Sequence, residues 1–361
     1  MHPFRNMVIQ FTRSGFKMIC LVLCCNCVTP VEIPVDKVGG QLVVSGQVSN
    51  IQEQNIVQLG LSADTDRLPY PLSGATIALI DDAGGYSYYE EDYSNPGSYL
   101  LANTAGIPGR VYYIQITTPN GAVFESVAER MPDAAGQITT HHEFLLEEYT
   151  DLEGTVLTDQ FIKIYTNSSL PTNIGESYLK WGIEEAFLLT PTDFPDPFGV
   201  VPPPCFIVQN ADPQRIPLFN SESLNTQTID NLLIGSRIVD WSFLEKHYFT
   251  TYQTSMTKEA YEYWEKVNIL ANQVGSIFDT PPAAINGNVF GVSNSSIKAL
   301  GYFQAVNQTY DRFYTHVNDL PFQLTSTTCT YGPYRSYESY PYRCLDCPSV
   351  RNSSYKRPSW F

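Results

Sequence analysis

The chain has 361 residues, of which 43% are hydrophobic and 13% aromatic, so it can bury a large core and is not intrinsically disordered. Its 37 Asp and Glu outnumber its 21 Lys and Arg, which gives a formal net charge of -16 and excludes nucleic acid as a partner. A chain of this length is expected to form two domains, or one large domain with an appendage.

The N-terminal segment is predicted to be a lipoprotein signal. Three basic side chains precede an apolar run that is too short to cross a bilayer, and four cysteines lie within residues 20–27. We expect residues 1–26 to be removed, Cys27 to carry the lipid with Cys25 as the alternative, and residues 27–40 to form a tether. A plain secretory signal is the other interpretation. Removal of the signal takes away three basic and no acidic side chains, so the net charge becomes -19.

Residues 41–131 are predicted to form a transthyretin-like or immunoglobulin-like β-sandwich. Short segments rich in β-branched and aromatic residues alternate with turns that contain Gly, Pro and Asn. The predicted strands are 41–48, 56–61, 75–81, 99–102, 111–117 and 123–128. The segment 74–82, followed by 96–99, resembles a carboxypeptidase regulatory-like domain. That resemblance implies a spacer or docking platform and assigns no chemistry.

A hinge is expected at residues 131–136, and residues 137–361 are predicted to form a second, mostly β domain. Alternating polar and apolar residues predict strands at 161–166 and 178–189. Six prolines mark a long loop over residues 191–204, and a loop of this length in a compact domain is usually either functional or poorly ordered.

One helix is predicted, over about residues 258–274. Thr257 suits the N-cap, Glu259 lies in the first turn, and Gly275 suits the C-terminal cap. Apolar residues at helical spacing are interpreted as a stripe that packs on the core. These are Ala260, Tyr261, Trp264, Val267, Ala271 and Val274.

The C-terminal domain contains four cysteines: Cys205, Cys329, Cys344 and Cys347. An even number in an exported chain favours disulfides, and four cysteines allow three pairings. We expect Cys205 to pair with Cys329 or with one of the two C-terminal cysteines, which would stabilise the tail. The alternatives are a Cys-x-x-Cys redox site and half of a zinc site. A redox pair would normally open a helix, and zinc would need two more ligands.

The tail is rich in tyrosine and arginine, which are enriched at interfaces and in ligand clefts. It is a candidate binding patch for a partner or an anionic ligand. The alternative is that the tyrosines pack a loop against the domain. The residues are Tyr331, Tyr334, Arg335, Tyr337, Tyr340, Tyr342 and Arg343.

No catalytic set, cofactor motif or metal site is predicted. The His-His-Glu run at 141–143 lacks the second histidine of a metalloprotease motif and is interpreted as a strand end. Ser177 with Lys180, and Ser295 with Lys298, match the spacing of a serine–lysine nucleophile pair but lack its partner motifs.

Several segments in order along the chain resemble a Bacteroidota lipoprotein family labelled domain of unknown function 4249. They are 27–33, 255–264, 275–279, 287–289, 300–303 and 344–347, with Lys356, Pro358 and Trp360 near the end. The family tail is usually glycine-rich after its last cysteine, whereas residues 348–354 contain no glycine. The resemblance implies a lipid-anchored protein of the outer membrane, at the cell surface in preference to the periplasmic face.

Members of this family are often encoded beside TonB-dependent outer-membrane transporters. The resemblance therefore implies a non-catalytic accessory subunit that captures a small ligand or peptide, or caps the transporter. The alternatives are an envelope scaffold or assembly factor, and an unrecognised hydrolase. A capture protein should have an aromatic-lined cleft near the tail at 331–342 and the loop at 191–204. A scaffold should have a flat exposed apolar face, and a hydrolase carboxylates or a Ser/His pair in one pocket.

Overall fold

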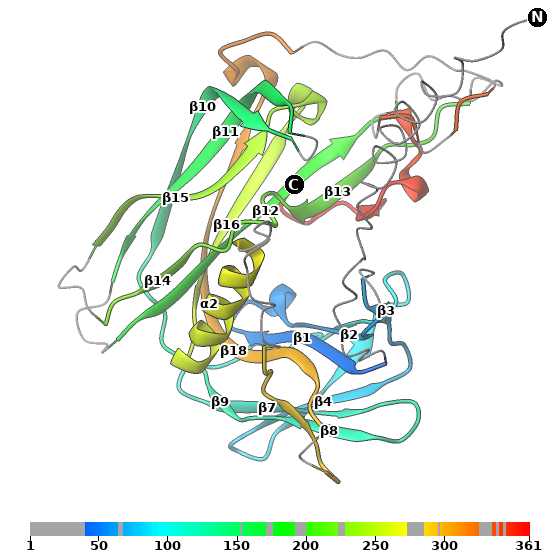
Figure 1. The fold of residues 1–361 in the computed structure, drawn as a ribbon, viewed down its shortest axis with the longest axis vertical. Coiled ribbons are helices and arrows are strands. Elements are labelled where there is room, and N and C mark those ends of the chain that lie inside the picture. Colours follow the sequence, from blue (N-terminus) through cyan, green and yellow to red (C-terminus); the bar gives the residue numbers. More distant parts are fainter. Residues whose placement is uncertain are drawn as a thin grey trace, which may run out of the picture. The chain divides into compact units, whose positions relative to one another are not determined.

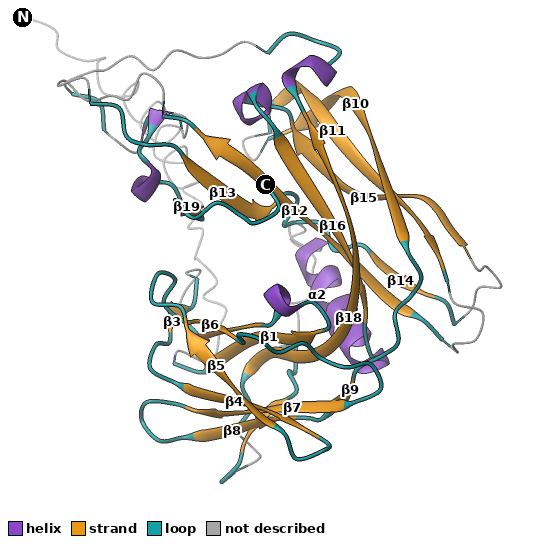
Figure 2. Cartoon of the chain, turned by 180° about the vertical axis from the view of Figure 1, so that it is seen from behind, coloured by secondary structure: helices purple, strands orange, loops and turns teal. Residues whose placement is uncertain are grey.

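The computed structural model describes residues 40–63, 68–151, 154–170, 176–191, 200–222, 228–272, 285–294, 297–324, 334–336, 339–341 and 344–361. All of them belong to one compact unit. The expected signal and nearly all of the tether, with Cys25 and Cys27, lie outside the described residues. The described chain is mainly β with a single α-helix, which confirms the predicted fold class (Figure 2). Among these residues no helix is both long and apolar enough to cross a bilayer.

The first group of strands forms a sandwich around one core. All six predicted strands are present, and β2 and β7 begin and end at the predicted residues. The strands are β1 (Leu42–Ser49), β2 (Ile56–Leu61), β3 (Tyr70–Pro71), β4 (Thr76–Asp81), β5 (Tyr86–Glu91), β6 (Ser98–Leu100), β7 (Val111–Thr117), β8 (Val123–Ser126) and β9 (Glu129–Arg130). Strands β1, β2 and β6 pair on one side, and β4, β7 and β8 on the other. Inward residues such as Val44, Val57, Ile77 and Ile114 fill the space between.

The second group of strands forms two further sheets (Figure 1). A three-stranded sheet consists of β10 (Ile138–Thr150), β11 (Val156–Ser169) and β15 (Thr228–Ile238). The other sheet contains β12 (Tyr178–Leu189), β13 (Cys205–Asn210), β14 (Leu218–Asn220), β16 (His247–Ser255), β18 (Leu300–Thr315) and β19 (Ser353–Ser354). A second core, with Ile162, Trp181 and Phe249, includes residues from both sheets.

Strand β18 belongs to both groups. Its first half runs parallel to β1, from Leu300 opposite Val43 to Val306 opposite Ser49. Its second half pairs antiparallel with β16, from Asn307 opposite Ser255 to Thr315 opposite His247. The short strand β17 (Val289–Gly291) pairs with β8. The sandwich that begins near residue 42 is therefore completed by strands that lie beyond residue 285.

Two glycines allow close backbone contacts of β18, one with β1 and one with the segment before β17. Gly301 has a φ of +88°, and a Cβ at this position would lie 1.9 Å from the carbonyl oxygen of Val44. A Cβ at Gly287 would lie 1.8 Å from the carbonyl oxygen of Gly301. Only glycine fits at these positions, because a side chain at Gly301 would push β18 away from β1, and one at Gly287 would push the segment before β17 away from β18.

Helix α2 (Lys258–Asn272) follows β16, as predicted. The Thr257 hydroxyl accepts a hydrogen bond from the Ala260 N–H at 3.2 Å, so Thr257 is the N-cap. The predicted apolar stripe packs mainly through its first two turns. Ala260 is buried and Trp264 is half-buried against a small cluster, whereas Ala271 is exposed. The predicted Val274 and Gly275 lie outside the described residues.

The C-terminal segment is fixed by a disulfide between Cys205 and Cys347, whose Cα atoms are 6.0 Å apart. Cys344 is disulfide-bonded as well, and Cys329 lies outside the described residues. The last residue, Phe361, packs on Phe206 and Tyr248. The tail is therefore joined to β13 by a covalent bond and by aromatic contacts.

We expect Gly301→Ala to lower the free energy of unfolding by at least about 3 kcal/mol, because the added methyl group collides with the β1 backbone at a strained φ. Gly121→Ala is the matched control. Gly121 has a φ of +83° but open space around a Cβ, so only the backbone strain of about 1 kcal/mol remains. Urea denaturation measures both variants, and equal losses would contradict the close β1–β18 crossing.

Candidate functional site

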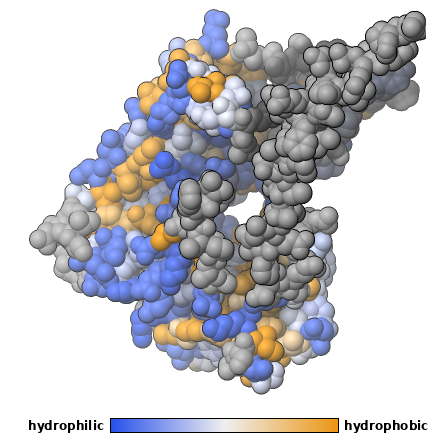
Figure 3. All heavy atoms as spheres, in the orientation of Figure 1, coloured by the Kyte–Doolittle hydropathy of each residue, from blue (hydrophilic) through white to orange (hydrophobic). Residues whose placement is uncertain are grey.

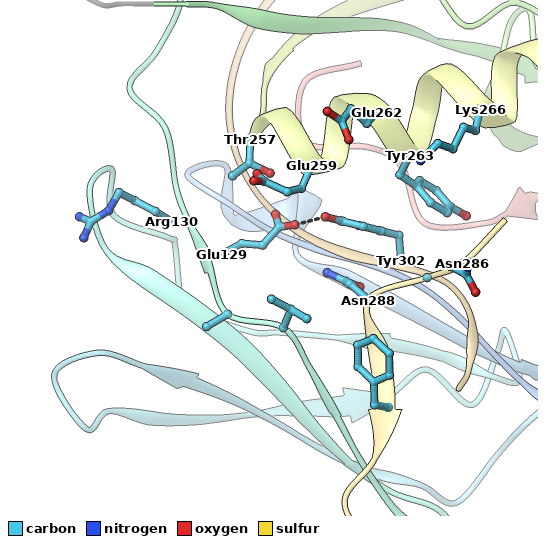
Figure 4. A pocket seen from close by; sticks show the side chains of 14 residues that line it. Glu129, Arg130, Thr257, Glu259, Glu262, Tyr263, Lys266, Asn286, Asn288 and Tyr302 are labelled. Carbon is cyan, nitrogen blue, oxygen red and sulfur yellow. Dashed lines mark hydrogen bonds between the residues drawn. The ribbon is translucent and has the colours of Figure 1, made fainter. Parts of the chain in front are cut away.

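A pocket of about 460 Å³ lies beside the first turns of α2. Its lining side chains come from β9, α2, β17 and β18, and from the segment before β17 (Figure 4). Glu129 and Tyr302 point toward each other from β9 and β18, while Thr257 and Glu259 lie next to them at the start of the helix. The side chain of Arg130 points away and donates to the Gly109 carbonyl. The pocket therefore brings together segments that are far apart in the sequence.

Glu129 is the most perturbed carboxyl group in this pocket. It is 5% exposed, and it accepts hydrogen bonds from the Tyr302 hydroxyl and, at 3.2 Å, from the Ala305 N–H. Burial raises the pKa of Glu129 to about 7, while the hydrogen bonds it accepts, including one from Thr257, lower it. The neighbouring Glu259 raises this pKa further.

This carboxyl group connects three elements and is not free for chemistry. Both of its oxygens accept hydrogen bonds from β18, and the Thr257 hydroxyl adds a third from the residue before α2. Glu259 and Glu262 also line the pocket, but both are exposed on the helix surface. Three carboxylates thus share one pocket, as a hydrolase would require, but the buried one is bound by protein donors. We interpret Glu129 as a structural clasp between β9, β18 and α2.

A second hollow lies over β12 and β16, on the side of α2 that carries Trp264. It has a volume of about 510 Å³ and adjoins a smaller hollow of about 270 Å³. Lys180, Trp264, Gln47 and Gln54 line both, so we treat the two hollows as one cleft. Gly182 forms part of its floor, and a Cβ at Gly182 would meet nothing within 4 Å. A cleft of this size is in the range of small-molecule sites.

Lys180 is the unusual charge of this cleft. Its ammonium nitrogen lies 3.5 Å from the centre of the Trp264 ring, and among the described residues it forms no ion pair. Burial lowers the pKa of Lys180 to about 8. The cation–π contact replaces only part of the hydration that the ammonium group has lost.

A chain of hydrogen bonds between glutamines holds the Trp264 side of the cleft. The indole N–H of Trp264 donates to Gln304 at 2.9 Å, and the Gln304 amide donates to Gln47 at 3.1 Å. Further along, the Gln308 amide donates to the Thr254 hydroxyl at 3.1 Å. These bonds connect α2, β18, β1 and β16. The cleft walls are therefore fixed by the same elements that cross at β18.

A buried ionic network lies on the opposite face of β12 and β16. Glu185, which is 1% exposed, is 3.0 Å from His247 and 3.1 Å from Arg237, and it also accepts from Gln209 at 2.7 Å. Burial alone would raise the pKa of Glu185, but the His247 hydrogen bond and the Arg237 charge bring it below its usual value. Protein groups surround this carboxylate, so it is not available to a ligand.

The predicted tail patch is only partly described. Tyr334 is fully exposed, and the Arg335 guanidinium lies 4.3 Å from the ring centre of Tyr340. Tyr340 is buried in the cluster around the disulfide. The patch stays a prediction, because four of its members lie outside the described residues: Tyr331, Tyr337, Tyr342 and Arg343. None of the described tail residues lines the cleft or the Glu129 pocket.

The other sequence candidates do not form sites in the described residues. His141 contacts Asn231 at 2.7 Å, and His142 stacks on Phe313. Among described residues, no group of three or more His, Cys, Asp or Glu is placed to hold a metal ion. Ser177 and Lys180 are three residues apart at a strand, a spacing that puts their side chains on opposite faces.

The fold and the cleft define a mainly β protein with a ligand-sized, polar and aromatic site beside its described helix. The model of a family described as a domain of unknown function (DUF4249) matches residues 28–312, and the chain belongs to this family. The sequence resemblance to the family is thus confirmed. No curated protein and no solved structure matches the chain.

Sequence reasoning did not identify the residues of either pocket as a site. The sequence singles out Lys180 only by its spacing from Ser177, and Trp264 only as part of the apolar stripe and of the segment 255–264 that resembles the family. Glu129 ends a predicted strand region and has no distinguishing neighbours in the sequence. A lysine inside a predicted strand was the one usable signal, because strand lysines are uncommon away from edges.

We expect the stability of the wild type to fall by up to about 3 kcal/mol between pH 4.5 and 7 through Glu129 alone. The folded state raises the pKa of this group to about 7, so it binds a proton that the unfolded chain has released in that range. Glu129→Gln cannot titrate and should remove this part of the pH dependence. Thermal unfolding of both proteins from pH 4.5 to 8 measures the difference. If the stability of the wild type and of Glu129→Gln depended on pH in the same way, the raised pKa of Glu129 would be contradicted.

Proposed function

We propose that the chain is a non-catalytic binding protein that captures a small ligand in the cleft over β12 and β16. The observation that carries this proposal is the cleft itself, with Lys180 and Trp264 in its wall and open space above Gly182. The protein is lipid-anchored to the outer membrane through Cys27, or alternatively Cys25, and hands the ligand to a TonB-dependent transporter.

The construction of the cleft supports binding. Trp264 is fixed through Gln304 and Gln47, so the aromatic wall is in place before a ligand arrives. Polar side chains from the sandwich face aromatic and charged side chains from the second sheet and the helix. Such a mixture of an apolar platform and a few fixed polar groups is typical of small-molecule sites.

The arrangement of acidic groups favours binding over hydrolysis. A pair of working carboxylates needs at least one oxygen free to meet a substrate. Both Glu129 oxygens accept from protein donors, and Glu185 is enclosed by His247, Arg237 and Gln209. Glu184 lines the cleft, but no second carboxyl group stands beside it among the described cleft residues. Capture and release without bond breaking is therefore the function that this geometry supports best.

The partner assignment rests on the family, whose members are often encoded beside TonB-dependent transporters. The rival role, an envelope scaffold, predicts a wide apolar face. On the face in Figure 3, the hydrophobic residues that are coloured lie in several separate areas among hydrophilic ones. The exposed Tyr334 and the neighbouring Arg335 remain the candidate contacts for a protein partner.

We expect Gly182→Leu to abolish ligand binding without loss of stability. The new side chain enters open space in the floor of the cleft, at a backbone conformation that other residues can adopt. A panel of neutral and acidic oligosaccharides and of tripeptides is tested by thermal shift. Thr158→Leu, which adds the same side chain at an exposed position of β11, is the control. If a compound that binds the wild type also binds Gly182→Leu, or if no compound of the panel binds the wild type, the cleft is not supported as the ligand site.

Affinity purification of the tagged, lipidated protein from gently solubilised outer membrane tests the partner. We expect mass spectrometry to find a TonB-dependent transporter in stoichiometric amount. Recovery of the lipoprotein alone would argue for a free-standing binder, and recovery of assembly or secretion components would argue for the scaffold.

A further inference from the structure

Lys180 is a partly buried cation without an ionic partner among the described residues. Its ammonium group lies against the Trp264 ring, and no carboxylate of that part of the chain lies within ion-pair distance. An ammonium group that loses water is unfavourable until a counter-ion supplies the missing charge. An anion from solution would supply it, because Lys180 lines both parts of the open cleft.

Arg215, the other cation that lines the cleft, has a carboxylate partner. Arg215 lies 3.8 Å from Asp212. Glu184 also lines the cleft and forms no ion pair among the described residues. Burial raises the pKa of Glu184, and the charge of Arg312 opposes that rise. Of the two cations that line the cleft, Lys180 is the one without a carboxylate partner among the described residues.

The remaining polar wall suits hydroxyl groups. Gln58 and Asn210 present amides, and Ser45 presents a hydroxyl, to the two parts of the cleft. A primary amide and a hydroxyl each donate and accept hydrogen bonds, as does each hydroxyl of a sugar. The indole of Trp264 adds an apolar surface beside them.

We propose that the cleft binds an anionic saccharide, a sugar acid or a sugar phosphate, with Lys180 as the counter-ion of its charged group. This inference rests on the proposed capture function and specifies its ligand. The net charge of -16 repels anions from most of the surface. Selectivity for a negative ligand therefore depends on a local cation that lacks a carboxylate partner, and among the described residues of the cleft this is Lys180.

Isothermal titration calorimetry of the full chain with three probes tests the inference. The probes are digalacturonate, galactose 1-phosphate and the neutral disaccharide galactobiose. We expect at least one anionic probe to bind about ten-fold or more tightly than galactobiose, and which one binds distinguishes carboxylate from phosphate. Equal binding of all three, or binding of none, would overturn the proposal.

Two variants separate charge from packing. Lys180→Met keeps a flexible apolar side chain against Trp264 and should weaken the anionic probe about ten- to hundred-fold while it leaves the melting temperature unchanged or higher. Lys180→Arg retains the charge and should retain most of the binding. If Lys180→Met weakens the binding of neutral and anionic probes equally, or if it lowers the melting temperature as the loss of a structural residue would, the counter-ion role is wrong.

The two proposals fail in different ways. One outcome is that Gly182→Leu removes binding of a probe while Lys180→Met leaves the ratio of affinities for anionic and neutral probes unchanged. In that case the cleft is the capture site, and only the proposal of an anionic ligand is wrong. If a probe binds and neither variant affects it, the cleft is not the site.

Discussion

The parallel pairing of β1 with the first half of β18 is the constraint on which the rest of the structure depends. Because β18 continues without a break into its pairing with β16, one strand carries the hydrogen-bond ladders of the sandwich and of the second sheet. A continuous ladder leaves little freedom in how the two sheets are oriented at the crossing. Gly301 makes that crossing possible by allowing β18 to approach Val44 closely.

Both pockets lie at this crossing for the same reason. Helix α2 leaves β16 there and is fixed on one side by the Glu129 clasp and on the other by the bond from Trp264 to Gln304. The polar residues Gln304 and Gln308 lie on the strand that the two sheets share, so the cleft wall and the junction consist of the same backbone. A rigid junction thus provides a preformed site, as binding proteins require.

The sequence predicts local structure well where turns and apolar alternation are clear. The strands at 56–61, 111–117 and 178–189 have the predicted bounds, because β-branched and aromatic residues lie between Gly, Pro and Asn turns. Strand β18 was not recognised, since Gln304 and Gln308 interrupt its apolar pattern. Their amides are satisfied by partners from β1, α2 and β16, which only the folded chain brings together. The sites escaped prediction for the same reason.

The shared strand also has a consequence for how the chain acquires its structure. Gln47 and Gln304 are 257 positions apart and lie opposite each other in the β1–β18 ladder, so the first sheet cannot close until most of the polypeptide has been synthesised. Contacts of such high sequence separation form slowly and leave an open edge on β1 in the meantime. A polypeptide that closes so late depends on protection from aggregation until its last third arrives.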